Sequence, residues 1–146
     1  MQDIQVTDRR RLRGAWGAWL GEYEWSHIVH LTTATPFSEA RLVKAFRDEF
    51  VRYAEKVAQN PVPYWFAVEG GALGDRPHIH ALLAGAERLT TAQLVGAWRH
   101  ARPERLRVSE YDAALGASYY ITKEIGGRAL DYGASKRFPR RLYRAA

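Results

Sequence analysis

Residues 64–83, YWFAVEGGALGDRPHIHALL, determine the fold that the sequence predicts. Two apolar runs, Tyr64–Glu69 and His78–Leu83, flank a glycine-rich segment at 70–76. A segment of this composition lets two strands pair as an antiparallel hairpin. We therefore expect the two runs to be neighbouring strands of an antiparallel sheet.

The second of these strands carries two histidines on one face. Side chains alternate between the faces of a strand, so His78 and His80 point the same way and Ile79 points into the opposite layer. The same alternation puts three residues of the first strand on a single face, which we assign to the face of the histidines: Trp65, Ala67 and Glu69.

Two imidazoles side by side form half of a metal site, and a carboxylate can complete it. Glu69 stands at the end of the first strand. Three ligands from His78, His80 and Glu69 would leave open positions for water or a phosphate oxygen. Asp75 is an alternative carboxylate, but its place inside the glycine-rich segment makes it the less rigid ligand.

A tyrosine and a lysine follow in the stretch Tyr119-Tyr120-Ile121-Thr122-Lys123. A tyrosine phenol can attack phosphorus when a cation disperses the developing charge, and Lys123 adds positive charge beside it. Both Tyr119 and Tyr120 have a helical spacing that brings them to Lys123, so helical geometry leaves the choice between them open. Together with the metal ligands, these residue types indicate metal-assisted phosphodiester chemistry.

Composition indicates one folded domain with an anionic partner. The chain has 146 residues, of which 47% are hydrophobic, and a formal net charge of +6 at pH 7. This length is that of a single domain, and the positive charge points to nucleic acid. There is no cysteine, which excludes disulfides and thiolate zinc sites and fits a reducing compartment.

The sequence shows no sign of a membrane segment. No apolar run approaches the roughly 20 residues that span a bilayer. Residues 9–20 combine arginines with a short apolar stretch, but this stretch is rich in tryptophan, broken by glycine and followed by no small-residue cleavage site. We therefore reject a signal peptide and expect a cytoplasmic protein with no membrane partner.

The order of the expected elements is typical of an α+β domain. We expect a central antiparallel sheet of about five strands, ferredoxin- or RRM-like, with helices packed mainly on one face and the other face open. The whole chain, 1–146, would form one domain with a core at about 25–127, a basic arm at 1–20 and a basic, extended tail at 128–146. Around the hairpin, the sequence predicts a strand at 25–33, a helix from Thr35-Pro36 to about residue 58, a helix at about 91–100, a strand at 105–109 and a helix at about 113–125.

Three motifs stand in order along the chain: a hydrophobic strand ending in threonines at 28–33, His-hydrophobic-His at 78–80, and Tyr-x-x-Lys within 118–124. This arrangement resembles the HUH endonucleases, in particular the single-tyrosine rolling-circle replication initiators (Rep proteins) of plasmids, phages and small circular DNA viruses. The resemblance covers about residues 25–127. Its second and third motifs are specific, whereas the first is nearly generic.

The resemblance implies a metal-dependent nicking and joining activity. It implies that Glu69 and the two histidines of the second motif bind Mg²⁺ or Mn²⁺. It also implies that Tyr120, favoured over Tyr119 by the family pattern, attacks single-stranded DNA at a replication origin with Lys123 beside it. The products would be a 5′-phosphotyrosine link and a free 3′-hydroxyl. The chain has no Gly-x-x-x-x-Gly-Lys-Ser/Thr loop, so unwinding would fall to a host or separate helicase.

Basic side chains outside the motifs are expected to contact the DNA, because guanidinium groups bind phosphate in a bidentate manner and stack on bases. The candidates are Arg9, Arg10, Arg11, Arg13, Arg76, Lys136 and Arg137. Trp16 and Trp19, one helical turn apart, are expected to cover the core rather than stack on bases. We interpret three further histidines as ordinary sheet or surface residues: His27, His30 and His100.

Three other functions fit parts of the sequence. A single-strand transposase or a relaxase would use the same chemistry, although transposases of this kind usually carry glutamine where Lys123 stands. A non-catalytic, RRM-like nucleic-acid-binding module would explain the aromatic residues at 64–66, but the RNP1 pattern is absent. A metal-dependent hydrolase of small phosphoesters would leave the positive charge unexplained.

Overall fold

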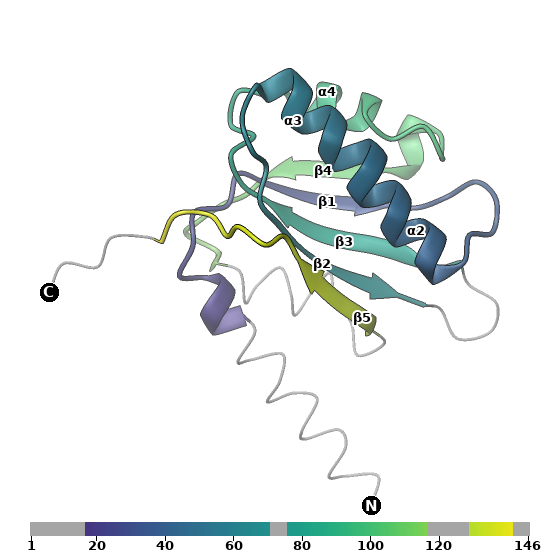
Figure 1. The fold of residues 1–146 in the computed structure, drawn as a ribbon, viewed down its shortest axis with the longest axis horizontal. Helices are drawn as coiled ribbons and strands as arrows, with labels where there is room; N and C mark the ends of the chain where they lie inside the picture. Colours follow the sequence, from purple (N-terminus) through teal and green to yellow (C-terminus); the bar gives the residue numbers. More distant parts are fainter. Residues whose placement is uncertain (1–16, 71–75, 117–128, 142–146) are drawn as a thin grey trace, which may run out of the picture.

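Five strands lie side by side in the order β4-β1-β3-β2-β5 in the computed structural model, which describes residues 17–70, 76–116 and 129–141 (Figure 1). Each neighbouring pair is antiparallel. The strands are β1 (His27–Leu31), β2 (Tyr64–Glu69), β3 (His78–Leu83), β4 (Arg107–Glu110) and β5 (Ala129–Ala134). The helical segments in the described residues are α2 (Glu39–Ala45), η1 (Phe46–Val51), α3 (Arg52–Ala58), α4 (Thr91–Gly96), η3 (Pro103–Arg105) and one turn at 17–20. The predicted α+β class with a central antiparallel sheet is confirmed.

The predicted hairpin is confirmed with the bounds that the sequence indicates. In the β2–β3 register Ala67 lies opposite His80, and Glu69 lies opposite His78. Residues directly opposite one another in a ladder project to the same face. The carboxylate and the two histidines therefore share one face of the sheet.

The main hydrophobic core lies between the other face of the sheet and the helices. α2, η1 and α3 follow one another without a break across this face, and α4 lies beside them (Figure 1). Phe46 and Phe50 on the π-helical segment η1 are fully buried, as are Phe66 on β2 and Ile79 on β3. Burial of each such side chain stabilises the fold by about 1.5–3 kcal/mol, so this layer fixes which face of the sheet remains for other uses.

The first long helix begins three residues later than Pro36, where the sequence suggested its first turn. Ser38 is the N-cap, because its side chain accepts a hydrogen bond from the backbone N–H of Arg41 at 3.1 Å. Phe37 and Leu42 occupy the two positions of a hydrophobic staple, and both are buried in the main core. Burial of Phe37 therefore favours Ser38 as the N-cap over Thr35, which the sequence indicates as the cap before Pro36.

Two shorter elements also differ in length from the prediction. α4 begins with a capping box between Thr90 and Gln93 but ends at Gly96 instead of about residue 100. Beyond it, the indole N–H of Trp98 donates to the carbonyl of Thr32 at 2.7 Å, which draws the chain back to the end of β1. β4 begins at Arg107, because the preceding residues form the proline-initiated turn η3.

The fifth strand lies in the region that we assigned to an extended tail. β5 pairs with the edge of β2, so the sheet extends beyond the core that ends at about residue 127. Its sequence, ALDYGA, carries no regular alternation, and its pairing depends on backbone hydrogen bonds to β2. The helix expected at about 113–125 lies mostly outside the described residues, which show a turn at 113–115.

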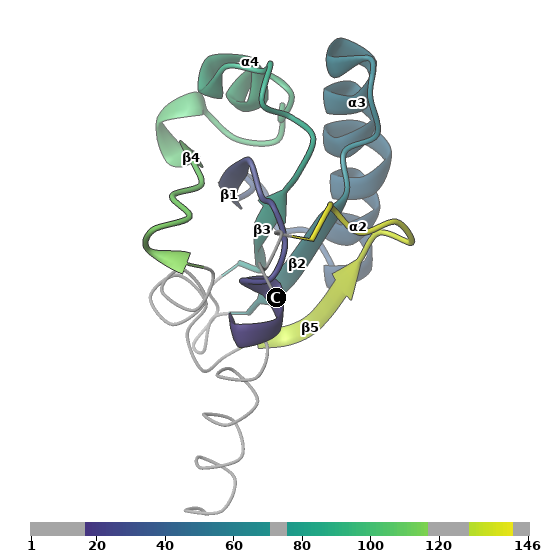
Figure 2. The ribbon, with the colours of Figure 1, turned by 90° about the vertical axis from the view of Figure 1, so that its left-hand side faces the viewer.

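The face that carries the histidines is covered at one end, in contrast to the fully open face that we expected. Leu20 of the turn at 17–20 packs with Trp25, Trp65 and Leu82 in a second buried cluster. Figure 2 shows the turn at 17–20 on the side of the sheet away from α3 and α4. Trp19 packs against this cluster, as predicted, and the end of the face around Glu69 is left uncovered by it.

None of the helices in the described part of the chain has both the length and the apolar composition needed to cross a bilayer.

β5 provides a direct test of the sheet. A Cβ atom at Gly133 would overlap the ring of Phe66, its partner on β2, so we expect Gly133→Ala to destabilise the protein by about 1–3 kcal/mol. Gly96→Ala is the matched control, since a Cβ there meets nothing within 4 Å and alanine favours the helix by about 1 kcal/mol. Urea unfolding of both variants measures the difference. Equal stability of the two would show that β5 does not pack as described.

Candidate metal centre

Three adjacent strands contribute imidazole or carboxylate groups to one point on the face of the sheet that is opposite the main core. β3 lies between β1 and β2 in the sheet. The register sets His30 of β1 opposite His80, and His78 opposite Glu69 of β2. The positions of the four groups therefore follow from strand pairing and not from loop conformation.

The three imidazoles form a compact cluster. One ligand atom from each of His30, His78 and His80 lies within 4.8 Å of the others. The rings of His30 and His80 stack with their centroids 4.1 Å apart, and that of His78 lies 5.0 Å from the ring of His30. These three residues could together hold one metal ion.

Glu69 adds a carboxylate to the same cluster. Its Oε2 lies 3.1 Å from Nε2 of His78 and also 3.1 Å from Nε2 of His80. Ligands at right angles around a cation with bonds of about 2.1 Å are themselves about 3 Å apart. The spacing between Glu69 and the two imidazoles is therefore that of neighbouring ligands of a single cation.

The orientation of the His78 ring leaves Nε2 directed at the cluster. Nδ1 lies 3.2 Å from the carbonyl oxygen of Arg76, which can only accept a hydrogen bond, so Nδ1 carries the proton. Nε2 of the same ring lies 3.1 Å from Oε2 of Glu69, where it either donates to this carboxylate or, once deprotonated, could bind a cation beside it. Metal-binding histidines usually have their second nitrogen fixed in this way by a carbonyl or a carboxylate.

The ionisation states in the cluster favour a cation. Burial, followed by the positive charge of His80, His78 and Arg107, lowers the pKa of His30 from 6.5 to about 3. Burial alone would raise the pKa of Glu69, but the close imidazoles of His78 and His80 outweigh it and lower that pKa to about 2. At neutral pH His30 therefore offers a lone pair and Glu69 a negative charge.

Several polar atoms of the cluster lack a hydrogen bond. Nε2 of His30, Nδ1 of His80 and Oε1 of Glu69 are buried and have no hydrogen-bond partner among the described residues. Leaving a buried polar atom unsatisfied costs about 1–3 kcal/mol. Three such atoms in one cluster fit a bound cation, which would satisfy imidazole nitrogen and carboxylate oxygen together.

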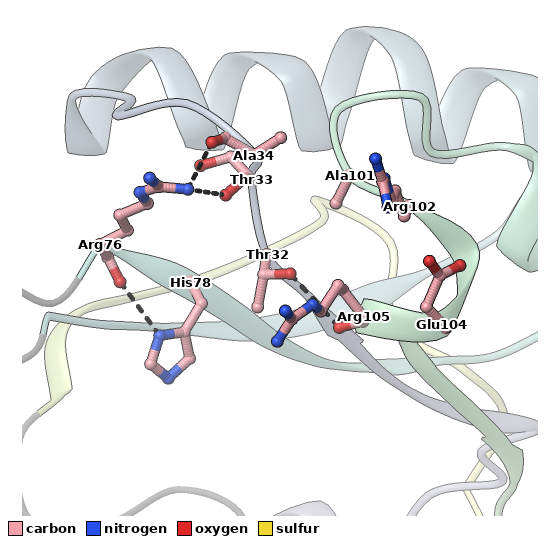
Figure 3. Close-up of a pocket in the computed structure, with 9 residues that line it drawn as sticks. All are labelled: Thr32, Thr33, Ala34, Arg76, His78, Ala101, Arg102, Glu104 and Arg105. Carbon is pink, nitrogen blue, oxygen red and sulfur yellow. Dashed lines mark hydrogen bonds between the residues drawn. The ribbon is translucent and has the colours of Figure 1, made fainter.

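A cavity of about 980 Å³ adjoins the cluster at His78 (Figure 3). Arg76, Arg102 and Arg105 line it together with one acidic residue, Glu104. On the other side of the cluster, Arg107 of β4 lies opposite His30 in the sheet. Positive charge therefore flanks the histidines on two sides, as an anionic substrate would require.

The residues predicted from sequence fall into three groups. His78, His80 and Glu69 come together, and Arg76 lines the adjacent cavity. Ser135 accepts a hydrogen bond from the backbone of Tyr64, so Lys136 and Arg137 begin at the opposite end of β2 from Glu69. The remaining candidates lie outside the described residues: Arg9, Arg10, Arg11, Arg13, Asp75, Tyr119, Tyr120 and Lys123.

The interpretation of His30 as an ordinary sheet residue is wrong, because its ring stacks within the cluster. Its alternation with the apolar Val29 and Leu31 was a signal in the sequence, but only the β1–β3 register brings it to His80. Arg102 and Arg105 were also missed, since the sequence suggested no cavity beside them. His100 agrees with the prediction, because it lies outside the cluster. Its Nε2 is 2.9 Å from Oε2 of Glu49.

Comparison of the chain with protein-family models, curated proteins and solved structures finds no match.

We expect the protein to bind a divalent cation and His30→Phe to weaken this binding at least tenfold, since even loss of an indirect partner of a metal ligand costs 10–100-fold. Phenylalanine keeps a ring for the stack with His80 but removes Nε2. Without metal, the variant should be as stable as the parent or more stable, because an unsatisfied buried atom is lost. Calorimetric titration with Mn²⁺ and thermal unfolding measure the two effects.

His100→Phe is the matched control, because it makes the same substitution outside the cluster. Its affinity for Mn²⁺ should equal that of the parent. Parental affinity in His30→Phe would remove His30 from the set of ligands and leave a centre of two histidines and Glu69.

Proposed function

We propose that this protein is a metal-dependent endonuclease and strand transferase that acts on single-stranded DNA and initiates rolling-circle replication, as the HUH motifs imply. The observation that carries the proposal is the cluster of His30, His78, His80 and Glu69 on the sheet face opposite the main core, with unsatisfied ligand atoms and arginines beside it. The motif Tyr120-x-x-Lys123 adds a nucleophile from the sequence.

In the proposed reaction the phenol oxygen of Tyr120 attacks a phosphorus atom of the DNA backbone. A bond forms between this oxygen and phosphorus, the bond between phosphorus and the 3′ oxygen breaks, and the phenol proton is lost. The 3′ oxygen leaves and takes up a proton to become a 3′-hydroxyl. One phosphodiester replaces another, so the DNA end on the tyrosine can be rejoined without external energy.

The described residues have a holding and orienting role in this scheme. Glu69 and the three histidines would hold a divalent cation, and the carbonyl of Arg76 fixes the ring of His78. When bound, the cation supplies positive charge that polarises a phosphoryl oxygen and stabilises the transition state. Lys123 contributes further positive charge near the phosphate that reacts.

The chemistry of the ligands bears on which cation is used. Carboxylate oxygen suits Mg²⁺ and Mn²⁺, whereas imidazole nitrogen favours transition metals over Mg²⁺. With three imidazoles close to one carboxylate, Mn²⁺ fits the cluster better than Mg²⁺. We therefore propose Mn²⁺ as the better of the two cofactors that the family resemblance implies.

The proposed physiological substrate is an unpaired segment at a replication origin, which a host or separate helicase keeps open. A cytoplasmic setting accords with this role and with the reducing compartment suggested by the absence of cysteine.

The nucleophile can be tested by deleting a single oxygen. We expect Tyr120→Phe to abolish covalent protein–DNA adducts, because a phenyl ring cannot attack phosphorus, while affinity for DNA hardly changes. Denaturing gel electrophoresis after incubation with a pool of single-stranded oligonucleotides and Mn²⁺ measures adducts, and fluorescence anisotropy measures affinity. Tyr119→Phe is the matched control and should retain adducts.

Each contrary outcome has a distinct meaning. Adducts that persist in Tyr120→Phe and disappear in Tyr119→Phe would transfer the role to Tyr119. Metal-dependent cleavage without adducts in the double variant would replace the nicking and joining mechanism by hydrolysis with water. No cleavage by the parent protein with any oligonucleotide in the pool and either Mg²⁺ or Mn²⁺ would overturn the proposal.

The form of the substrate provides a second test. In a duplex, the scissile phosphate would be kept at a distance from a metal centre on the face of a sheet. Single-stranded DNA should therefore be cut at least tenfold faster than the same site in linear duplex. Cleavage should also fall as salt rises, because counterions are released on binding. Initial rates on matched single-stranded and duplex oligonucleotides test this, and equal rates would contradict it.

A further inference from the structure

The cavity beside His78 is a second candidate binding site next to the metal cluster. It lies between the end of β1, the start of β3 and the segment that leads through η3 into β4 (Figure 3). Its volume of about 980 Å³ is at the upper end of the range for ligand sites. Because His78 belongs both to the metal cluster and to the cavity wall, a molecule held by the cluster could extend directly into the cavity.

The charged lining of the cavity is predominantly positive. Arg76, Arg102 and Arg105 oppose a single acidic residue, Glu104. Within the described part of the chain, the side chains of Arg102 and Arg105 have no hydrogen bond or ion pair. Figure 3 shows the guanidinium group of Arg105 extending into the space between its own backbone and His78. Two arginines thus offer unused donors in the cavity that adjoins the cluster.

Arg76 has a different role in the same cavity. Its guanidinium donates to the carbonyl of Thr33 at 3.0 Å and also to the carbonyl of Ala34. The carbonyl of Arg76 in turn orients the ring of His78. Arg76 therefore fixes one wall of the cavity to the end of β1, and Arg102 and Arg105 are left as the groups that can bind a ligand.

The lining also indicates which part of a nucleic acid would fit. Apart from the imidazole of His78, none of the described lining residues carries an aromatic ring, so the described lining offers mainly charge and hydrogen-bond donors. Arginine donors without aromatic partners suit phosphate and sugar, which carry no sequence information. We infer that the cavity binds the sugar-phosphate backbone of single-stranded DNA next to the phosphate at the metal centre, through Arg102 and Arg105. This inference rests on the proposed function for the identity of its ligand.

Binding in the absence of metal tests the cavity separately from the chemistry. The experiment measures anisotropy of two labelled 12-nucleotide strands of unrelated sequence in EDTA, over a range of salt concentrations. We expect the double variant Arg102→Gln/Arg105→Gln to bind both strands about tenfold more weakly. The negative slope of log affinity against log salt should become shallower by about 0.7 for each phosphate that the variant no longer neutralises.

The matched control removes the same charge elsewhere. Arg52 on α3 and Arg88 after β3 are exposed and lie away from the cavity, so Arg52→Gln/Arg88→Gln should leave the affinity within about twofold of the parent. Glu104→Gln tests the opposite sign: loss of its negative charge should tighten binding about two- to threefold, whereas Glu87→Gln at the far end of β3 should not.

The outcomes separate this inference from the proposed function. Equal weakening by the two arginine double variants, or a loss confined to one of the two sequences, would overturn a backbone site in the cavity. Adducts in the parent protein together with parental binding by the Arg102→Gln/Arg105→Gln variant would leave the nicking activity intact and remove the cavity from it. If the Arg102→Gln/Arg105→Gln variant alone binds DNA more weakly and the parent protein forms no adducts, the backbone-binding site is supported and the proposed enzymatic activity is overturned.

Discussion

The antiparallel register of β1, β3 and β2 is the constraint on which the rest of the molecule depends. It brings His30 opposite His80 and Glu69 opposite His78, so that four groups meet with no contribution from a loop. A shift of one residue in either pairing would move a histidine or the carboxylate to the other face of the sheet, into the main core. The large buried side chains of the helical face, such as Phe66 and Ile79, prevent that shift, and packing on one face thereby maintains chemistry on the other.

The sheet face that carries the histidines has two parts. One end is dry, where the turn at 17–20 and Trp25 pack over Trp65, and the other end carries the imidazoles and the carboxylate. Ala67 belongs to the apolar cluster and lies opposite His80, so the two regions are in contact. The apolar cluster limits access of water to the metal ligands from one side. Burial lowers the pKa of His30 and strengthens electrostatic interactions at the candidate metal centre.

Sequence patterns predicted the elements that have a strong local signal. The hairpin was predicted residue by residue because glycine-rich punctuation and apolar runs define both strands. His30 was missed because its importance arises from pairing between strands far apart in sequence, which no local pattern encodes. β5 was missed because ALDYGA lacks alternation, and the start of α2 was misplaced because burial of Phe37 selects Ser38 over Thr35 as the cap.

The alternation of β2 and β3 also has an evolutionary consequence. In β2, Phe66 and Val68 pack against the helices while Ala67 and Glu69 border the histidines, so neighbouring residues answer to different demands. Substitutions in the helical layer can be compensated by changes in volume elsewhere in that layer. A ligand atom at the centre has no such substitute. Alternate positions of these strands should therefore accept substitutions at two different rates. A descendant that lost the metal ligands could keep the whole fold.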